Sequence, residues 1–221
     1  MSTTLGEVEA IIWDFDGALV DSLPGIAHGV GETITAMGQP ARTPEEIRGM
    51  LGGGARQIFT MLFGESHPDL VEPALAHFHE HYPRLSTHGV TAYPGVPEAL
   101  AQLARTKKLA IVTAKMRAAT FAVLDKLGLA QYFDLVVSAD DVTRMKPDPE
   151  GINKVLEELG VAPERAVFIG DMKTDVAAGR AAGVHAVGVT WGYGARADLV
   201  LAEPDLLVDS VPEFMEALGS A

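Results

Sequence analysis

Six short runs of apolar, mostly branched residues recur along the chain, and helix-like stretches separate most of them. Each run is apolar at every position, which is typical of a parallel strand buried on both faces. Strands that alternate with helices form a parallel sheet with helices on both of its faces. The sequence therefore predicts a doubly wound, Rossmann-like α/β fold. The predicted strands are residues 10–13, 109–112, 135–137, 166–169, 186–189 and 206–208, and the predicted helices are residues 96–105, 116–127, 149–159 and 174–182.

A stretch of about 70 residues between the first two predicted strands breaks this alternation, because it contains no convincing strand. Thr43-Pro44-Glu45-Glu46 has the pattern of a capping box with proline at the first helical position. Ser66-His67-Pro68-Asp69 offers a second helix start. A segment of this length is too long for a loop. We therefore predict a helical insert over residues 22–93 and a core domain made of residues 1–21 and 94–221.

The acidic composition excludes some classes of partner. Thirty acidic against seventeen basic residues give a formal net charge of −13, whereas a general nucleic-acid binder needs a basic surface and anionic membranes attract basic segments. No apolar run approaches the roughly 18 residues of a membrane span. Residues 1–10 hold no lysine or arginine, unlike a secretory signal. The chain has no cysteine, so disulfides and thiolate chemistry are excluded. We expect a cytoplasmic protein that binds neither nucleic acid nor membranes.

Two carboxylates, Asp14 and Asp16, follow the first predicted strand in the segment Asp14-Phe15-Asp16-Gly17. Residues two apart point the same way if the strand continues. Such a pair could hold a hard divalent cation through oxygen ligands. Alternatively, one carboxylate could act as a nucleophile and the other as an acid and base. An ordinary strand end followed by turn residues is the simpler interpretation of the same pattern.

Two further polar segments follow other predicted strands. In Thr113-Ala114-Lys115, a hydroxyl and backbone N–H groups suit a phosphate, although an ordinary helix cap has the same pattern. In Lys146-Pro147-Asp148-Pro149, Pro147 favours an extended Lys146, and Asp148-Pro149 starts a helix. A lysine fixed in this way could neutralise a phosphate or a carboxylate, or it could be a solvated loop lysine.

A second pair of carboxylates, Asp171 and Asp175, follows the predicted strand 166–169. Asp171 lies at the strand tip, Asp175 lies one helical turn later, and Gly170 permits close approach of the backbone. Because parallel strands present their carboxyl ends at one edge of a sheet, we expect both acidic pairs to meet there. Without a cation, such a gathering of carboxylates would destabilise the fold by mutual repulsion.

The four polar segments, in this order and each at the end of a strand, resemble those of the haloacid dehalogenase superfamily of phosphohydrolases. The resemblance covers nearly the whole chain, is greatest to the phosphoglycolate phosphatases, and places the insert where that family has a helical cap domain. Residues 12–22, 112–115, 144–149 and 168–183 are similar to the four family motifs, and residues 188–194 are similar to the C-terminal strand and turn. Ala18 stands where a threonine or another branched residue is usual, and Ala114 stands where phosphoglycolate phosphatases often have asparagine.

The resemblance implies a role for each segment. Asp14 would attack the phosphoryl group and form an aspartyl-phosphate, and Asp16 would protonate the leaving oxygen and then activate water. Asp14, the backbone carbonyl of Asp16 and Asp171 would bind Mg²⁺, with Asp175 as a further ligand or as an acceptor behind them. A carboxylate and a phosphate dianion repel each other, so such a site must supply positive charge.

The remaining phosphate and substrate contacts are also implied by the resemblance. Thr113 and Lys146 would hold the other phosphate oxygens, with Ala114 and Lys115 beside the substrate. In the insert, Gly52-Gly53-Gly54-Ala55-Arg56 is either a flexible turn between helices or a loop that closes over the site, in which case Gly54 and Arg56 would contact the substrate.

Other residues carry weaker signals. His77 and His81 share one helix face, but no acidic partner or third ligand is evident, so we expect a solvated face for these two and for the nearby His79 and His88. The two tryptophans, Trp13 and Trp191, and the scattered methionines are expected to pack in the core.

The predicted function is the Mg²⁺-dependent hydrolysis of a small phosphorylated metabolite, with phosphoglycolate as the leading candidate by resemblance. Three alternatives stay open: a phosphomutase, a pyrophosphatase, and a binding module without catalytic activity. The expected assembly is a monomer or a homodimer.

Overall fold

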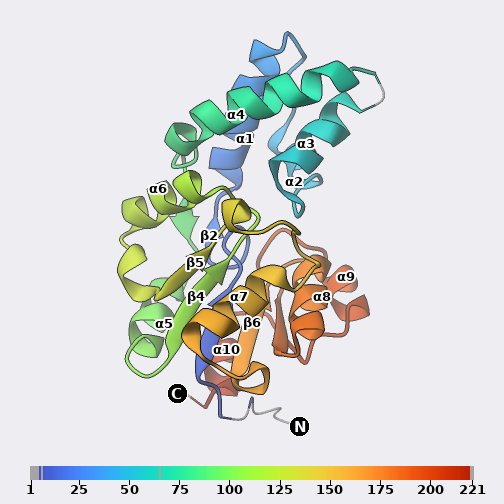
Figure 1. Ribbon diagram of the computed structural model, residues 1–221. Coiled ribbons are helices and arrows are strands. Elements are labelled where there is room, and N and C mark those ends of the chain that lie inside the picture. Colours follow the sequence, from blue (N-terminus) through green and yellow to red (C-terminus); the bar gives the residue numbers. More distant parts are fainter. Residues whose placement is uncertain (1–4, 6, 65, 220–221) are drawn as a thin grey trace.

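The fold was analysed in a computed structural model of the protein, which describes residues 5, 7–64 and 66–219. The ends of the predicted core domain, at residues 1–4, 6 and 220–221, and residue 65 of the predicted insert lie outside the described residues. Half of the segment expected not to be a secretory signal, residues 1–10, lies outside them as well. The described chain forms an α/β core with a group of helices above the ends of its strands (Figure 1).

The main sheet of the described chain has six parallel strands in the order β5-β4-β1-β6-β7-β8. Three strands have the predicted bounds, and the other three are longer by a single residue at one end. The strands are β1 (Ala10–Trp13), β4 (Lys108–Val112), β5 (Leu135–Val137), β6 (Ala166–Gly170), β7 (His185–Val189) and β8 (Leu206–Val208). The predicted doubly wound parallel sheet is therefore confirmed. Because the chain runs outward from β1 in both directions, a crevice at the carboxyl end of this strand is the expected place for a ligand.

Side chains of β1 alternate between two hydrophobic cores, one on each face of the sheet. Ile11 and Trp13 pack with helices α5, α6 and α10, whereas Ala10 and Ile12 pack with α7 and α8. Trp13 is fully buried and meets Phe214 of α10 edge to face, which confirms its packing role. The helices of the core are α5 (Val96–Leu103), α6 (Arg117–Leu127), α7 (Glu150–Leu159), α8 (Lys173–Ala182), α9 (Arg196–Leu201) and α10 (Val211–Ala217).

The predicted insert contains four helices that share a hydrophobic cluster, which includes Val30, Ile47, Phe59 and Phe78 and is joined by Ala119 of α6. The predicted capping box is present, because the Thr43 hydroxyl oxygen accepts from the N–H of Glu46 and the Glu46 carboxylate accepts from the N–H of Thr43. The helices are α1 (Leu23–Ala36), α2 (Pro44–Arg48), α3 (Gly54–Phe63) and α4 (Val71–Leu85), and a short 3-10 helix, Pro68–Leu70, precedes α4. The division of the chain at residues 22 and 93 stays a prediction.

The expectation that residues 22–93 contain no strand is wrong. A two-residue strand β3 (Thr91–Ala92) pairs antiparallel with β2 (Val20–Asp21), so the chain segments that enter and leave the insert lie side by side. Two paired residues are too short to leave an alternating pattern in the sequence.

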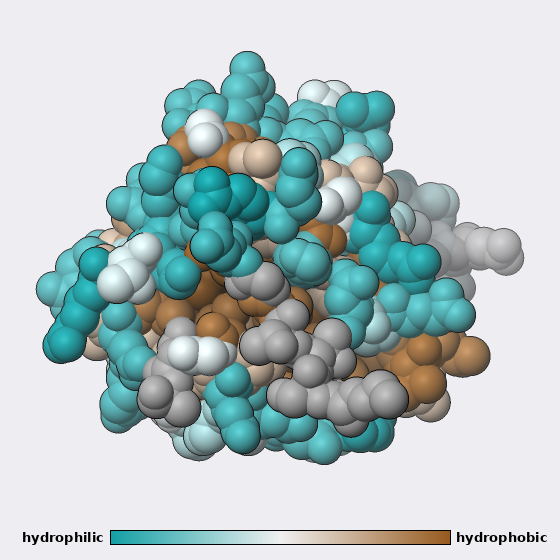
Figure 2. Space-filling model, turned by 90° about the horizontal axis from the view of Figure 1, so that it is seen from below, coloured by the Kyte–Doolittle hydropathy of each residue, from teal (hydrophilic) through white to brown (hydrophobic). Residues whose placement is uncertain are grey.

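None of the helices in the described part of the chain is long and apolar enough to cross a lipid bilayer. Seen from the end of the molecule opposite the insert, the surface is largely hydrophilic with scattered hydrophobic patches, as its acidic composition leads one to expect (Figure 2).

Candidate active site

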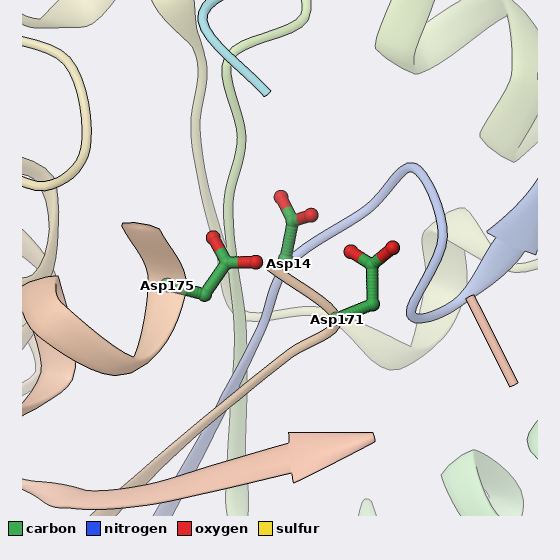
Figure 3. Close-up of side chains that lie close together, drawn as sticks. All are labelled: Asp14, Asp171 and Asp175. Carbon is green, nitrogen blue, oxygen red and sulfur yellow. The ribbon is translucent and has the colours of Figure 1, made fainter. Parts of the chain in front are cut away.

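Three carboxylates from separate segments meet at the carboxyl edge of the central strands. Asp14 follows β1, Asp171 follows β6, and Asp175 lies in the first turn of α8. Each offers an oxygen that lies within 4.8 Å of an oxygen from both of the others, and all three residues are buried (Figure 3). The two predicted acidic pairs therefore contribute three members to one cluster.

The Lys146 ammonium group lies between two of these carboxylates. Its Nζ is 2.6 Å from Asp14 Oδ1 and 2.7 Å from Asp175 Oδ1, and its side chain is only 8% exposed. Burial raises the pKa of Asp14 well above its usual range, with Asp175 and Asp171 adding to the rise, while Lys146 opposes it. The alternative of a solvated loop lysine is wrong, because Lys146 is a buried counter-ion.

Asp171 is held by backbone groups of the segment after β7. Its Oδ2 accepts from the N–H of Tyr193 at 2.6 Å and from the N–H of Gly194 at 3.3 Å. Its Oδ1 is buried and has no hydrogen-bond partner among the described residues. Burial, followed by the charge of Asp175, raises the pKa of Asp171 to about 7. An orphaned carboxylate oxygen beside two others suits a hard divalent cation such as Mg²⁺, which prefers oxygen ligands.

Glycines allow the backbone to approach Asp171 this closely. A Cβ atom on Gly192 would lie 2.4 Å from Asp171 Oδ2, and one on Gly17, whose φ is +94°, would lie 2.3 Å from the same oxygen. Only glycine fits either position without displacing the carboxylate.

The Asp16 side chain lies outside the three-carboxylate cluster and is paired with Lys115. Lys115 Nζ is 3.0 and 3.2 Å from the two Asp16 carboxylate oxygens and 2.6 Å from the hydroxyl of Tyr82, which belongs to helix α4 of the insert. Lys115 is buried, and the nearby Asp16 raises its pKa against the effect of burial. In the structure Lys115 lines the cavity and lies between Asp16 and the insert, and its contact with the substrate stays a prediction.

The segment after β4 forms the opposite wall. The Thr113 Oγ1 accepts a hydrogen bond from the N–H of Lys115 at 3.1 Å, which leaves its own O–H to be donated elsewhere. Gly54 of the insert lies against this segment, because a Cβ atom on it would be 3.4 Å from the Ala114 carbonyl oxygen. The glycine-rich turn of the insert thus borders the core, and its closure over the site, with contacts from Gly54 and Arg56 to the substrate, stays a prediction.

A cavity of about 890 Å³ lies between the core and the insert, and its wall includes every predicted site residue except Asp171. The predicted site residues in the wall are Asp14, Asp16, Gly54, Arg56, Thr113, Ala114, Lys115, Lys146 and Asp175. The Arg56 guanidinium is paired with the carboxylate of Glu72 on α4, and its side chain is 64% exposed.

Two residues near the site, Tyr82 and Tyr193, were not predicted from the sequence. Tyr82 reaches Lys115 from a distant helix, and the Tyr193 hydroxyl meets the Asp21 carboxylate and the N–H groups of Ser22 and Leu23 where the chain enters the insert. Tyr193 lies in the segment 188–194 that resembles a family turn, so that resemblance was a signal for it, whereas no pattern pointed to Tyr82.

The scattered methionines are not all core residues, because four of them, Met61, Met116, Met145 and Met172, line the cavity. Trp191 does pack against the core, and its indole N–H donates to the carbonyl of Ala18. The His77 and His81 rings contact each other edge to face, and no group of three metal-ligating side chains in the described chain includes either of them.

Comparison with known proteins gives consistent matches. Residues 11–189 match the family model of haloacid dehalogenase-like hydrolases. A phosphoglycolate phosphatase from Salmonella typhimurium is 32% identical, over 97% of this chain and 94% of that protein. The crystal structure of a protein described as a predicted phosphoglycolate phosphatase, from Haemophilus somnus, has a TM-score of 0.86, 24% identity, and coverage of 95% of this chain and 97% of that one. The structure of CbbY from Rhodobacter sphaeroides in complex with phosphate has a TM-score of 0.84 and 25% identity, over 96% of this chain and 99% of that one.

Proposed function

Because this chain belongs to the haloacid dehalogenase-like hydrolases and is a phosphatase similar to the phosphoglycolate phosphatases, we propose that it hydrolyses a small phosphate monoester through an aspartyl-phosphate on Asp14, with Mg²⁺ as cofactor. The observation that carries this proposal is the meeting of Asp14, Asp171 and Asp175 around one point, with Lys146 paired to two of them and with Asp14, Asp175 and Lys146 lining the cavity. The predicted cytoplasmic location and the monomeric or dimeric state stay predictions.

In the first step, an Asp14 carboxylate oxygen attacks phosphorus, and the bond from phosphorus to the leaving oxygen breaks. Asp14 must be ionised to attack, and burial alone disfavours the ionised form. Lys146, at 2.6 Å, counteracts this effect and also supplies positive charge next to the transferring phosphoryl group. The Thr113 hydroxyl would donate a hydrogen bond to another phosphate oxygen.

Asp16 would give its proton to the leaving oxygen as that bond breaks. In the second step, it would take a proton from a water molecule that attacks phosphorus, and the bond between phosphorus and the Asp14 oxygen breaks to release inorganic phosphate. Its position two residues after Asp14 lets it face the same cavity. Lys115 fixes its orientation through two contacts of 3.0 and 3.2 Å.

Asp14, Asp171 and Asp175 would hold Mg²⁺, with the backbone carbonyl of Asp16 as a further oxygen ligand. The unpartnered Oδ1 of Asp171 is the observation that supports this set of ligands. When bound, the cation neutralises the clustered negative charge and stabilises charge on the transferring phosphoryl group. Asp175 also accepts from the N–H of Met172, which fixes one of its oxygens and leaves the other for Lys146 or the cation.

The test is release of inorganic phosphate from a panel that includes phosphoglycolate, sugar phosphates, nucleotides and pyrophosphate, with Mg²⁺ and with a chelator. We expect Mg²⁺-dependent release from monoesters, with phosphoglycolate as the reference substrate because the relatives carry that name. A preference for pyrophosphate would point to a pyrophosphatase, and a bisphosphate product with little free phosphate would point to a mutase. No reaction with any compound would favour a binding module and refute the proposal.

A further inference from the structure

Three loops at the carboxyl edge of the sheet each place a methionine next to a residue of the site. Met116 follows Lys115, Met145 precedes Lys146, and Met172 follows Asp171. All three methionines line the cavity, and Met61 of helix α3, whose side chain is 53% exposed, lines it from the insert. Thioethers are flexible and polarisable, so such a wall adapts to apolar groups of different shapes.

The methionines reach the boundary between the core and the insert. A Cβ atom on Gly52 would lie 3.0 Å from the Met172 methyl carbon, and one on Gly54 would lie 4.0 Å from the Met145 methyl carbon. On the insert side, the wall continues with apolar side chains, which include Leu51, Ile58 and Phe78. The polar floor with Asp14 and Lys146 therefore lies below a largely apolar upper wall, in which Gln57, Thr60 and His79 are polar exceptions on the insert side.

The cationic groups of the wall are already engaged. The lysine and arginine side chains among its residues are Arg56, Lys115 and Lys146, and each contacts a carboxylate of the protein. A leaving group that carried its own carboxylate, as glycolate does, would compete with protein carboxylates for the two buried lysines, or would have to reach the exposed Arg56 or His79 of the insert. A neutral leaving group makes no such demand.

The size of the cavity points the same way. At about 890 Å³ it lies in the upper part of the range, roughly 300–1,000 Å³, that holds drug-sized ligands. A two-carbon phosphate ester would leave most of the apolar wall in contact with water, whereas a longer chain would bury it.

We propose that the preferred substrate is a phosphate monoester with a neutral, largely apolar leaving group longer than glycolate, held against Met61, Met116, Met145 and Met172. This inference rests on the proposed phosphatase function and specifies its substrate class.

The test is kcat/KM for a series of straight-chain alkyl phosphates, from methyl to hexyl phosphate, with phosphoglycolate alongside. The leaving alcohols of the series have nearly equal reactivity, so differences report contacts with the wall. Each methylene that reaches the wall should raise kcat/KM by up to about fourfold, and hexyl phosphate should exceed phosphoglycolate. A flat series, or phosphoglycolate as the best substrate, would overturn the inference and leave the phosphatase function intact.

A matched pair of variants separates the wall from general effects on the fold. Met61→Gln replaces an exposed apolar side chain in the cavity, and Leu201→Gln replaces one that is 80% exposed on α9 and does not belong to the cavity wall. Met61→Gln should lower kcat/KM for hexyl phosphate by about fivefold and change that for methyl phosphate less than twofold. Leu201→Gln should change neither value. Equal effects of Met61→Gln on both substrates would contradict a role for this wall.

Binding of alkyl phosphonates, which are not hydrolysed, gives a readout that does not need catalysis. With Mg²⁺ present, the melting temperature should rise more with hexylphosphonate than with methylphosphonate at equal concentration. If the longer phosphonate binds better but no phosphate ester is hydrolysed, the proposed function fails while the specificity of the cavity stands. If chain length has no effect on binding, the inference fails whatever the activity.

Discussion

Replacing Lys146 with methionine tests whether this lysine holds the buried carboxylates together. The substitution keeps an unbranched side chain but removes the charge that lies 2.6 Å from Asp14 and 2.7 Å from Asp175. Two carboxylates whose oxygens lie within 4.8 Å of each other repel by at least about 3.5 kcal/mol at an effective dielectric constant of roughly 20. Removing one partner of a buried ion pair costs about 3–5 kcal/mol.

The assay is thermal unfolding at pH 8 in the presence of a chelator. For a chain of this size, about 1 kcal/mol shifts the melting temperature by roughly 2–4 °C, so Lys146→Met should lower it by about 6–20 °C. At pH 5 the loss should be smaller, because Asp14 and Asp171, whose pKa values are raised, can take up protons. The double variant Lys146→Met with Asp14→Asn should regain part of the lost melting temperature.

Lys173→Met is the matched control, because the Lys173 side chain is 65% exposed and 3.7 Å from Asp198. Exposed ion pairs contribute at most about 1 kcal/mol, so this variant should melt close to the wild type. If Lys146→Met and Lys173→Met had the same melting temperature at pH 8, the assignment of Lys146 as the counter-ion of the cluster would be refuted.

Three further predictions concern the same site. Gly192→Ala should abolish stabilisation by Mg²⁺ in a thermal-shift assay, because its Cβ would lie 2.4 Å from Asp171 Oδ2. The control Gly31→Ala, in open space on α1, should stabilise the protein by about 0.5–1 kcal/mol. Equal responses of the two variants to Mg²⁺ would contradict a role for the close approach of the Gly192 backbone to Asp171. In the metal-free protein, the pKa of Asp171 is raised to about 7, so its stabilising contribution is complete below pH 4 and is lost as the pH rises through 7. The melting temperature in chelator should therefore fall between pH 4 and pH 7, and saturating Mg²⁺ at pH 8 should restore roughly 5–10 °C. If the melting temperature of Asp171→Asn in chelator depended on pH as that of the wild type does, Asp171 would not be the titrating group. Tyr82→Phe removes the hydroxyl 2.6 Å from Lys115 Nζ, and we expect kcat to fall about tenfold with KM nearly unchanged; a change confined to KM would instead place Tyr82 in substrate binding.

The sheet was predictable because the four inner strands are largely buried on both faces, and all six strands carry a continuous apolar run. The predicted bounds of β1, β5 and β8 match the structure. Helix ends were less certain: α5 stops at Leu103, whereas its apolar pattern predicts an end at residue 105. The short helix α9 was not predicted, because six residues carry too little helical periodicity.

The candidate site was partly predictable because parallel strands bring their carboxyl ends to one edge. That rule brings Asp14 and Asp171 together before any distance is known. Partners that come from distant helices cannot be read in this way. Tyr82 contacts Lys115 only because α4 folds back over the core, and the pairing of Arg56 with Glu72 depends on how α3 and α4 pack.

The methionines illustrate the same limit of sequence patterns. Met116, Met145 and Met172 lie in loops, where no periodicity indicates whether a side chain faces the core, the solvent or a cavity. Their position next to Lys115, Lys146 and Asp171 was visible in the sequence, but its meaning depends on the insert that covers them.

The proposed mechanism requires that Asp14 becomes phosphorylated, and this can be measured as the mass of the Asp16→Asn variant after reaction with p-nitrophenyl phosphate and Mg²⁺. This leaving group needs no proton from Asp16, so the first step should proceed while attack by water is slowed. We predict that the quenched variant carries one phosphoryl group, located on Asp14 by peptide mapping and absent when Asp14 is also replaced by asparagine. The wild type should hydrolyse this compound rapidly. If Asp14 nevertheless stayed unmodified in the Asp16→Asn variant, and if Asp14→Asn released phosphate as fast as the wild type, Asp14 would not be the nucleophile.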